Sequence, residues 1–226
     1  MKPISDPPAP SATSATELNL GAVIAVVTVE RASDAEPIIG ALLAGGISAI
    51  ELTLRTPAAL PALKLMRGAA PHLRLGAGTV LTPAQADLAQ AAGADFALAP
   101  GLDEETVRHC ARIGLPFIPG VATASEIQKA TNLGCRFLKF FPAEALGGAR
   151  GLRMLNAPFE HLGLRFLPLG GIEATLAGGY LAQRCVATVG GSWIASAERI
   201  RRGAWDEIRE QAAAAMAIGR SAPPSI

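Results

Sequence analysis

One lysine of the chain falls inside an apolar stretch that is typical of a β-strand. Lys139 lies in residues 136–141, Arg-Phe-Leu-Lys-Phe-Phe. The other three lysines fall near the start of the sequence or in predicted surface helices: Lys2, Lys64 and Lys129. Desolvation among apolar neighbours favours a neutral amine, which is a nucleophile toward carbonyl groups. Lys139 is therefore a candidate for Schiff-base chemistry, although a lysine at a strand end can also extend its ammonium group to water.

A second polar set alternates with apolar residues in segment 50–55, Ile-Glu-Leu-Thr-Leu-Arg. Period-two alternation places Glu51, Thr53 and Arg55 on one face of a strand. If the apolar face packs against helices, the polar face points inward, where charged groups need partners. Such a face suits acid–base chemistry and anion binding, but it also suits a structural ion pair, and the pattern alone favours neither.

Two glycine-rich segments follow the last two predicted strands. They are Gly170-Gly171 and Gly190-Gly191-Ser192. Glycine lets backbone N–H groups approach an oxyanion, and the serine adds a hydroxyl donor. Loops after the seventh and eighth strands often bind phosphate in eight-stranded α/β barrels, so this pair favours phosphate binding over a purely steric role. Gly76-Ala77-Gly78-Thr79, at the end of the third strand, also allows close approach and offers a hydroxyl, but it is a weaker signal that a tight turn explains equally well.

Short β-branched runs alternate with Ala-rich helical stretches along most of the chain. Strands are expected at residues 22–29, 48–54, 73–79, 95–99, 116–118, 136–141, 164–169 and 185–189. Helices are expected at residues 33–44, 57–67, from 82, 103–113, 123–132, 150–156, 174–181 and 193–218. Alternating βα units predict a parallel sheet, either doubly wound or closed. Eight similar units without an early G-x-G-x-x-G motif favour a (β/α)8 TIM barrel, with the active site at the carboxyl ends of the strands.

The composition limits the possible classes of protein. The 226 residues are 50% hydrophobic and 17% charged, with a net charge of +1. These values exclude a disordered chain and argue against nucleic-acid or membrane binding. We expect a flexible N-terminal tail at residues 1–18, a single barrel domain at 19–219 and a frayed C-terminus at 220–226.

Cysteine and histidine usage indicates the compartment and argues against a metal centre. Three distant cysteines without C-x-x-C spacing, and no secretory signal, predict a cytoplasmic protein with reduced thiols. No spacing of ligating side chains indicates a metal site. Surface positions are expected for His72, His109 and His161.

The strand-end segments together resemble those of the 2-keto-3-deoxy-6-phosphogluconate (KDPG) aldolases, a family of class I barrel enzymes. The likeness runs from about Leu20 to Ala215 in the same order and at matching spacing. The matching segments are residues 51–56, 76–81, 99–101, 118–120, 137–144, 168–172 and 189–193. The segments around Glu51 and Lys139 are the most specific of these.

The resemblance implies a reaction and two catalytic residues. Lys139 would form a Schiff base with the C2 carbonyl of the keto acid, and Glu51 would act as general acid and base through a bound water. The products would be pyruvate and glyceraldehyde 3-phosphate. The resemblance implies no cofactor or metal, because the iminium is the electrophile, and it implies a homotrimer.

The resemblance also implies the groups that hold the substrate. Arg55 and Thr79 would bind the carboxylate at the pyruvate end, and Pro100 and Phe141 would shape the pocket. The phosphate would lie against four residues of the glycine loops: Gly170, Gly171, Gly191 and Ser192.

One residue departs from the pattern of the gluconate enzymes. They usually carry threonine where this chain has Leu169, and the related 2-keto-3-deoxy-6-phosphogalactonate aldolases carry an apolar residue there. Segments 54–56, 142–144 and 192–193 nevertheless resemble the gluconate branch. A galactonate-type substrate and 4-hydroxy-2-oxoglutarate therefore remain alternatives, as do a phosphate-binding barrel isomerase or synthase and a phosphosugar-binding barrel without activity.

Overall fold

The computed structural model describes residues 18–221, so most of the expected N-terminal tail, and residues 222–226, lie outside the described residues. Nine parallel strands form two sheets in this part of the chain. The larger sheet, in the order β5-β4-β3-β2-β1-β9, contains β1 (Val23–Val27), β2 (Ala49–Thr53), β3 (Arg74–Gly78), β4 (Phe96–Leu98), β5 (Phe117–Ile118) and β9 (Val189–Gly191). The smaller sheet contains β6 (Gly120–Val121), β7 (Phe137–Phe140) and β8 (Arg165–Pro168).

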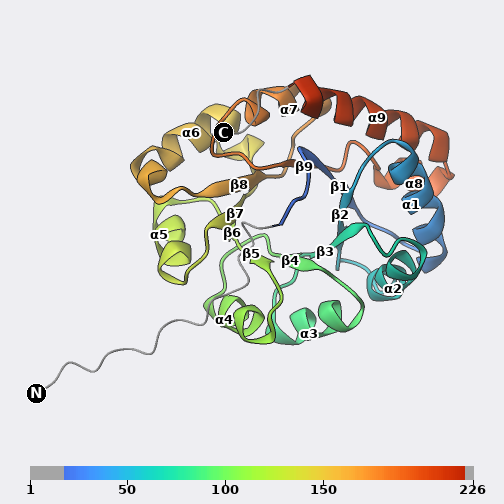
Figure 1. Cartoon of the computed structure of the whole chain (residues 1–226), viewed down its shortest axis with the longest axis horizontal. Coiled ribbons are helices and arrows are strands. Elements are labelled where there is room, and N and C mark those ends of the chain that lie inside the picture. The colour runs from blue at the N-terminus through green and yellow to red at the C-terminus, as the bar shows by residue number, and fades with distance from the viewer. Residues whose placement is uncertain (1–17, 222–226) are drawn as a thin grey trace, which may run out of the picture.

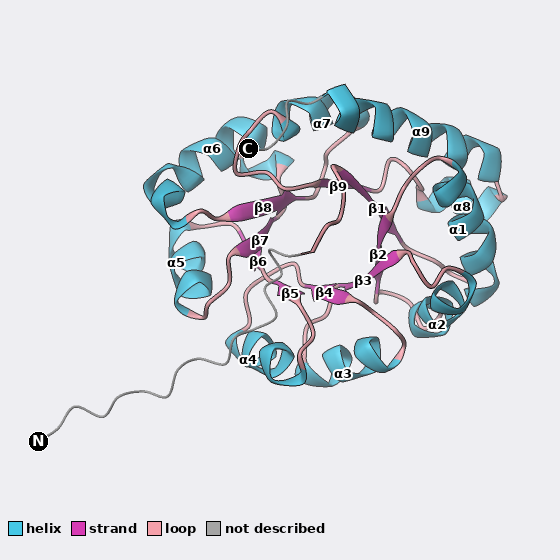
Figure 2. Ribbon diagram, in the orientation of Figure 1, coloured by secondary structure: helices cyan, strands magenta, loops and turns pink. Residues whose placement is uncertain are grey.

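Helices alternate with the strands and lie outside them (Figures 1 and 2). They are α1 (Ala35–Ala44), α2 (Ala59–Ala69), α3 (Pro83–Ala91), α4 (Glu104–Ile113), α5 (Ala124–Asn132), α6 (Gly148–Asn156), α7 (Ala174–Leu181), α8 (Ala197–Arg202) and α9 (Trp205–Ser221). Short 3-10 helices cover Ala32–Asp34, Glu144–Leu146 and Ala157–Leu162. None of the helices in the described part is long and apolar enough to cross a membrane. The predicted α/β class with parallel strands is confirmed.

Backbone hydrogen bonds also link the edges of the two sheets. On one side, the N–H of Gly120 in β6 donates to the carbonyl of Gly101, just after β4, at 3.1 Å. On the other side, the N–H of Ala187, just before β9, donates to the carbonyl of Phe166 in β8 at 2.9 Å. The strands consequently surround a central space in Figure 2.

Two apolar clusters lie on the two sides of the strands. The larger one packs strands against helices, and the smaller one fills the space that the strands surround with Leu20, Ile24, Val26, Ala49, Phe96, Leu98, Ile118, Phe137, Leu167 and Leu169. Along β2, Ile50 and Leu52 belong to the outer cluster and Ala49 to the inner one. Period-two alternation therefore turns the buried Glu51 and Thr53 inward, as the sequence predicts.

Side-chain caps begin helices α3 and α4. Thr82 accepts a hydrogen bond from the N–H of Gln85 and precedes Pro83, which suits the first turn of α3. Asp103 begins α4, where its Oδ2 accepts from the N–H of Thr106 at 2.8 Å and from the hydroxyl of the same residue at 2.6 Å. These bonds favour the carboxylate and hold the pKa of Asp103 below its usual value.

Three predicted elements differ from the structure. The strand expected at 116–118 lies at Phe117–Ile118 as β5. A further strand that was not predicted, β6, begins in the other sheet after Pro119, which has no N–H for the ladder. The last strand lies at Val189–Gly191, so that only Val189 and an isolated bridge at Val186 fall within the expected 185–189. The helix expected at 193–218 is two helices, since Gly203 ends α8 with a φ of 68°.

Two smaller differences concern the C-terminus and a histidine. Helix α9 continues to Ser221, two residues into the segment expected to be frayed. His72 and His161 are exposed as predicted, but His109 is half-buried and its Nε2 lies 2.7 Å from Oδ1 of Asp87. The i,i+3 neighbour Arg112 contacts the other ring nitrogen at 3.0 Å.

A hydrogen-bond network around Arg67 fixes the starts of β3 and β4. The predicted site lies at the opposite, carboxyl ends of these strands. Arg67 of α2 donates to the carbonyls of Gly93 and Pro71 at 2.9 and 2.7 Å, and to Oδ2 of Asp95 at 2.6 Å. The same Asp95 oxygen accepts from the N–H of Leu75 at 2.8 Å. Both charged side chains are about one-quarter exposed, at 25% and 27%.

We expect Arg67→Ala to lower the free energy of unfolding by about 2–3 kcal/mol, because it leaves several half-buried acceptors without a donor. The matched control is Arg108→Ala, which removes an exposed ion pair with Glu104 within α4 and should cost no more than about 0.5 kcal/mol. Urea unfolding of both variants measures the difference. Equal losses of stability would contradict the assignment of Arg67 as a structural tie.

Candidate active site

The centre of the candidate site is a buried pair of opposite charges contributed by the two sheets. Nζ of Lys139, in β7, lies 3.3 Å from Oε1 of Glu51, in β2. The two side chains are only 6% and 1% exposed. The structure thus brings together the two residues that the sequence singles out as catalytic candidates, although 88 positions separate them.

Within the described part of the chain, the surroundings of the Lys139–Glu51 pair leave one carboxylate oxygen without a partner and place an aromatic ring beside the amine. The second carboxylate oxygen of Glu51, Oε2, is buried and has no hydrogen-bond partner among the described residues. An acceptor in that state costs free energy unless something else binds it. Nζ of Lys139 also lies 5.2 Å from the ring centroid of Phe141, so the predicted pocket residue contacts the amine. An amine beside a carboxylate with a free oxygen is equipped for both covalent attack and proton transfer.

Glycines on the neighbouring strand make room for this pair. Gly76 is paired in register with Glu51, and Gly78 with Thr53. A Cβ atom on Gly78 would overlap the Glu51 carboxylate, and one on Gly76 would overlap the ring of Phe96. The predicted glycine segment at the end of β3 therefore gives space to the carboxylate.

The residues predicted to hold a substrate carboxylate and to shape its pocket follow the carboxyl ends of their strands. Arg55 lies in the turn after β2, is exposed and makes no hydrogen bond or ion pair with another residue in 18–221. Thr79 directly follows β3, is half-buried and has a φ of 61°. A β-branched residue in the left-handed region is strained, and such strain is typical of functional sites. Pro100 follows β4 and is half-buried.

The two glycine loops predicted to hold phosphate adjoin one another. Gly170 and Gly171 follow β8 with φ values of 101° and 79°, which glycine adopts readily. A Cβ atom on Gly190 would overlap the side chain of Leu169, so the end of β8 packs directly on β9. Leu169 is 4% exposed and belongs to the inner cluster. Gly191 ends β9, and Ser192, which follows it, is exposed.

Two polar contacts near the site were not predicted. The hydroxyls of Thr28 and Thr53 lie 2.8 Å apart. The hydroxyl of Tyr180 donates to Oε1 of Glu144 at 2.6 Å, and burial, followed by the bond to Glu144, raises the pKa of that tyrosine. Glu144 also donates its N–H to the carbonyl of Gly170 at 3.1 Å. The sequence could have indicated Thr28, because it continues the alternation that turns Ile24 and Val26 of β1 inward. The contact between Tyr180 and Glu144 joins two different helices, and such a contact leaves no local pattern in the sequence.

Residues 18–221 contain no group of three or more His, Cys, Asp or Glu side chains that could hold a metal ion. The three cysteines are free, and burial raises the pKa of the Cys110 thiol to about 12 and that of Cys135 to about 11. Neither thiol is therefore a thiolate nucleophile at neutral pH.

Comparison with known proteins decides the family. The model of the KDPG and KHG aldolase family matches residues 15–211. This chain belongs to that family. The resemblance found in the sequence is thereby confirmed.

Individual members of the KDPG and KHG aldolase family are similar to this chain over most of their length. The 2-dehydro-3-deoxy-phosphogluconate aldolase of Treponema pallidum is 44% identical over 82% of this chain and 88% of its own. The KHG/KDPG aldolase of Escherichia coli K12 is 39% identical over 86% and 91%. The KDPG aldolase of Legionella pneumophila, solved with pyruvate captured as a covalent carbinolamine, is 41% identical, covers 87% of this chain and 95% of its own, and superposes with a TM-score of 0.84.

We expect Gly78→Ala to lower kcat/KM for aldol cleavage by about a hundredfold or more, because the new methyl group displaces the Glu51 carboxylate from Lys139. Gly68→Ala is the matched control, since its position in α2 has open space around the added methyl group. Steady-state kinetics of both variants, with urea unfolding to verify the fold, provide the measurement. Full activity in the Gly78 variant would contradict the proposed geometry.

Proposed function

We propose that this chain is a class I aldolase that cleaves KDPG to pyruvate and glyceraldehyde 3-phosphate. The observation that carries the proposal is the buried contact of 3.3 Å between Nζ of Lys139 and Oε1 of Glu51. Family membership and the covalent pyruvate adduct of the Legionella enzyme support it. An isomerase or synthase would share the glycine loops but has no need of this pair.

The reaction begins with covalent attack by the lysine. Glu51 accepts a proton from Lys139, and the neutral amine adds to the C2 carbonyl of the keto acid. Glu51 returns that proton to the hydroxyl group of the resulting carbinolamine, which leaves as water, so that a protonated imine and the Glu51 carboxylate remain. This cation is an electron sink next to the bond that must break, so the chemistry proceeds without a metal.

Cleavage then needs one proton transfer in each direction. Glu51, through a bound water, takes the proton of the C4 hydroxyl, and the C3–C4 bond breaks. Its electron pair forms the enamine, and C4 leaves as the aldehyde of glyceraldehyde 3-phosphate. The carboxylic acid returns the proton to C3, and addition of water to the imine releases pyruvate and the lysine amine.

The strand-end residues hold the two ends of the substrate. Arg55 and Thr79 bind the carboxylate of the pyruvate end, and the exposed guanidinium of Arg55 is a suitable donor because no described residue engages it. Pro100 and Phe141 line the space around the imine. At the other end, backbone N–H groups and one hydroxyl hold the phosphate: Gly170, Gly171, Gly191 and Ser192.

We also propose that the two sheets are arcs of one closed (β/α)8 barrel, supported by the hydrogen bonds at both junctions. Eight-stranded barrels place their active sites at the carboxyl ends of the strands, where the candidate substrate-binding residues lie, while Glu51 and Lys139 project from the strands β2 and β7 themselves. By analogy with the family we propose a homotrimer. The three free cysteines support a location in the reducing cytoplasm.

A second substrate is favoured by one residue. Leu169 directly follows the carboxyl end of β8, and its apolar side chain belongs to the inner cluster, next to the predicted phosphate loop. The gluconate enzymes usually offer a threonine hydroxyl there, so 2-keto-3-deoxy-6-phosphogalactonate is the second candidate. The smaller 4-hydroxy-2-oxoglutarate needs no phosphate loop and is a third.

The decisive test is reduction with borohydride in the presence of pyruvate. We expect one reduced pyruvyl adduct per chain, located at Lys139 by peptide mass spectrometry, because that amine is the buried nucleophile. Lys139→Met should abolish the adduct, and the control Lys64→Met, on an exposed position of α2, should retain it. An adduct only on Lys64 or Lys129, or none at all, would exclude the Schiff-base mechanism.

The identity of the sugar acid is tested at residue 169. We expect Leu169→Thr to shift the ratio of kcat/KM values toward the gluconate substrate over the galactonate substrate by about ten- to a hundredfold, the size of one specific polar contact. The control is Leu169→Ile, which stays apolar and should leave the ratio nearly unchanged. A ratio that responds equally to both changes would mean that residue 169 acts only through packing.

A further inference from the structure

The turn after β9 is held from outside by an arginine of the next helix. We propose that Arg199 is a positioning residue that fixes the phosphate-binding turn, Gly190–Ser192, through the backbone of Trp193. The inference rests on the proposed function, since it concerns the phosphate end of the same site. Arg199 lies in α8, and its side chain is 27% exposed.

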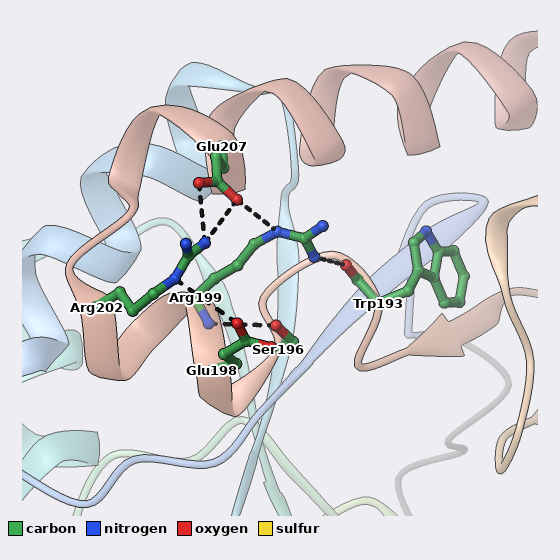
Figure 3. A network of polar contacts seen from close by, with 6 residues as sticks. All are labelled: Trp193, Ser196, Glu198, Arg199, Arg202 and Glu207. Carbon is green, nitrogen blue, oxygen red and sulfur yellow. Dashed lines mark hydrogen bonds and ion pairs between the residues drawn. The ribbon is translucent and has the colours of Figure 1, made fainter.

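Two hydrogen bonds from the side chain of Arg199 join the residue after the turn, Trp193, to helix α9 (Figure 3). Its Nη1 donates to the carbonyl of Trp193 at 2.8 Å, and its Nε donates to Oε2 of Glu207, in α9, at 3.2 Å. Its backbone N–H donates to Oγ of Ser196, the residue that caps α8, at 3.3 Å. The turn is therefore tied to α9, a long helix that packs against α1 and α7.

The charge of this arginine is already engaged, so it does not serve as a phosphate ligand. Glu207 also accepts from Nη2 of Arg202, at 3.0 and 3.1 Å. Nε of Arg202 in turn lies 3.9 Å from Oε1 of Glu198. Two guanidinium groups and two carboxylates thus balance one another, and the effect of Arg199 on the site is exerted through the backbone that it holds.

Trp193 transmits that restraint to the glycine of the turn. Its indole lies directly on Gly191, where a Cβ atom would overlap the ring. The indole Nε1 is buried and has no hydrogen-bond partner among the described residues. Packing alone fixes the ring, and the bond from Arg199 to the carbonyl is the polar restraint on this residue. Release of that carbonyl lets Trp193 shift, and with it Gly191 and the adjoining Ser192 N–H and hydroxyl.

A positioning role of this kind affects the phosphate end and spares the imine end. The Lys139–Glu51 pair lies in β7 and β2, and no hydrogen bond or ion pair joins either residue to α8 within residues 18–221. Loss of Arg199 should therefore weaken binding of a phosphorylated substrate while the amine still captures pyruvate. A merely structural role would lower both together.

The experiment compares Arg199→Met with Arg201→Met, an exposed arginine of the same helix. For Arg199→Met we expect KM for KDPG to rise by roughly ten- to a hundredfold, as for loss of one hydrogen bond from a charged donor. Its kcat/KM for unphosphorylated 2-keto-3-deoxygluconate, and its rate of pyruvate trapping by borohydride, should stay within about twofold of the unchanged enzyme, below the effect of one such bond. Arg201→Met should match the unchanged enzyme in all three measurements.

A second variant tests the anchor in α9. Glu207→Gln keeps an acceptor for Arg199 but removes the ion pair, so we expect a smaller rise of KM for KDPG in the same direction. A KM for Arg199→Met equal to that of Arg201→Met, or an equal loss of pyruvate trapping, would overturn the positioning role. If the unchanged enzyme traps pyruvate but prefers the unphosphorylated substrate, the phosphate turn itself is wrong and the proposal falls with it. Failure of the unchanged enzyme to trap pyruvate refutes the proposed function separately.

Discussion

The site depends on two opposite charges that the chain buries against each other. Lys139 and Glu51 are both almost inaccessible to water, and either one alone in that interior would cost several kcal/mol of desolvation. Each strand therefore has to deliver its charge to within reach of the other, β2 from the larger sheet and β7 from the smaller one. The pair does not fully compensate itself, because one oxygen of Glu51 has no partner in the described structure. That residual cost is met when a substrate or water supplies a donor, which ties the energetics of the fold to its function.

Space around the pair is as important as its charge. Gly76 and Gly78 lie in register beside β2. The absence of a side chain at Gly78 leaves room for the Glu51 carboxylate, and its absence at Gly76 leaves room for the ring of Phe96. Glycines weaken a strand by about 0.5–1 kcal/mol each relative to alanine, so this room has a cost in stability. The backbone of Thr79, with a φ of 61°, adds strain at the same place. The well-packed outer cluster and ties such as Arg67 offset these local losses on the side of the molecule away from the site.

Local patterns predicted the residues that lie on regular strands. Period two placed Glu51 and Thr53 on the inner face, as the structure confirms. The apolar neighbours of Lys139 predicted that it lies in a strand but left open whether its ammonium group reaches water, and the structure buries it. Strand β6 was missed because it is only two residues long and follows Pro119 directly, where the sequence indicates a turn. The contacts of Arg199 and Tyr180 could not be predicted, since their partners lie in other elements and hydrogen bonds of that kind depend on how helices dock. Sixteen arginines look alike in the sequence, and only the docking of α8 on α9 distinguishes Arg199 among them.

The two ends of the site are built in physically different ways, and this difference follows from what each must do. The proposed imine end needs charges held in a dry interior, and its side chains lie on strands, which the surrounding core fixes in position. The proposed phosphate end would bind a dianion through backbone N–H groups on turns, where Gly171 and Ser192 are exposed. Turns of this kind require external restraint, and Arg199 acting on Trp193 and Glu144 acting on Gly170 supply it from outside the strands. Leu169 lies where the two ends meet, packed on Gly190 and within the inner cluster. A change at that position would alter both the interior surface and the adjoining turn, and we therefore propose that this one residue decides which sugar acid fits.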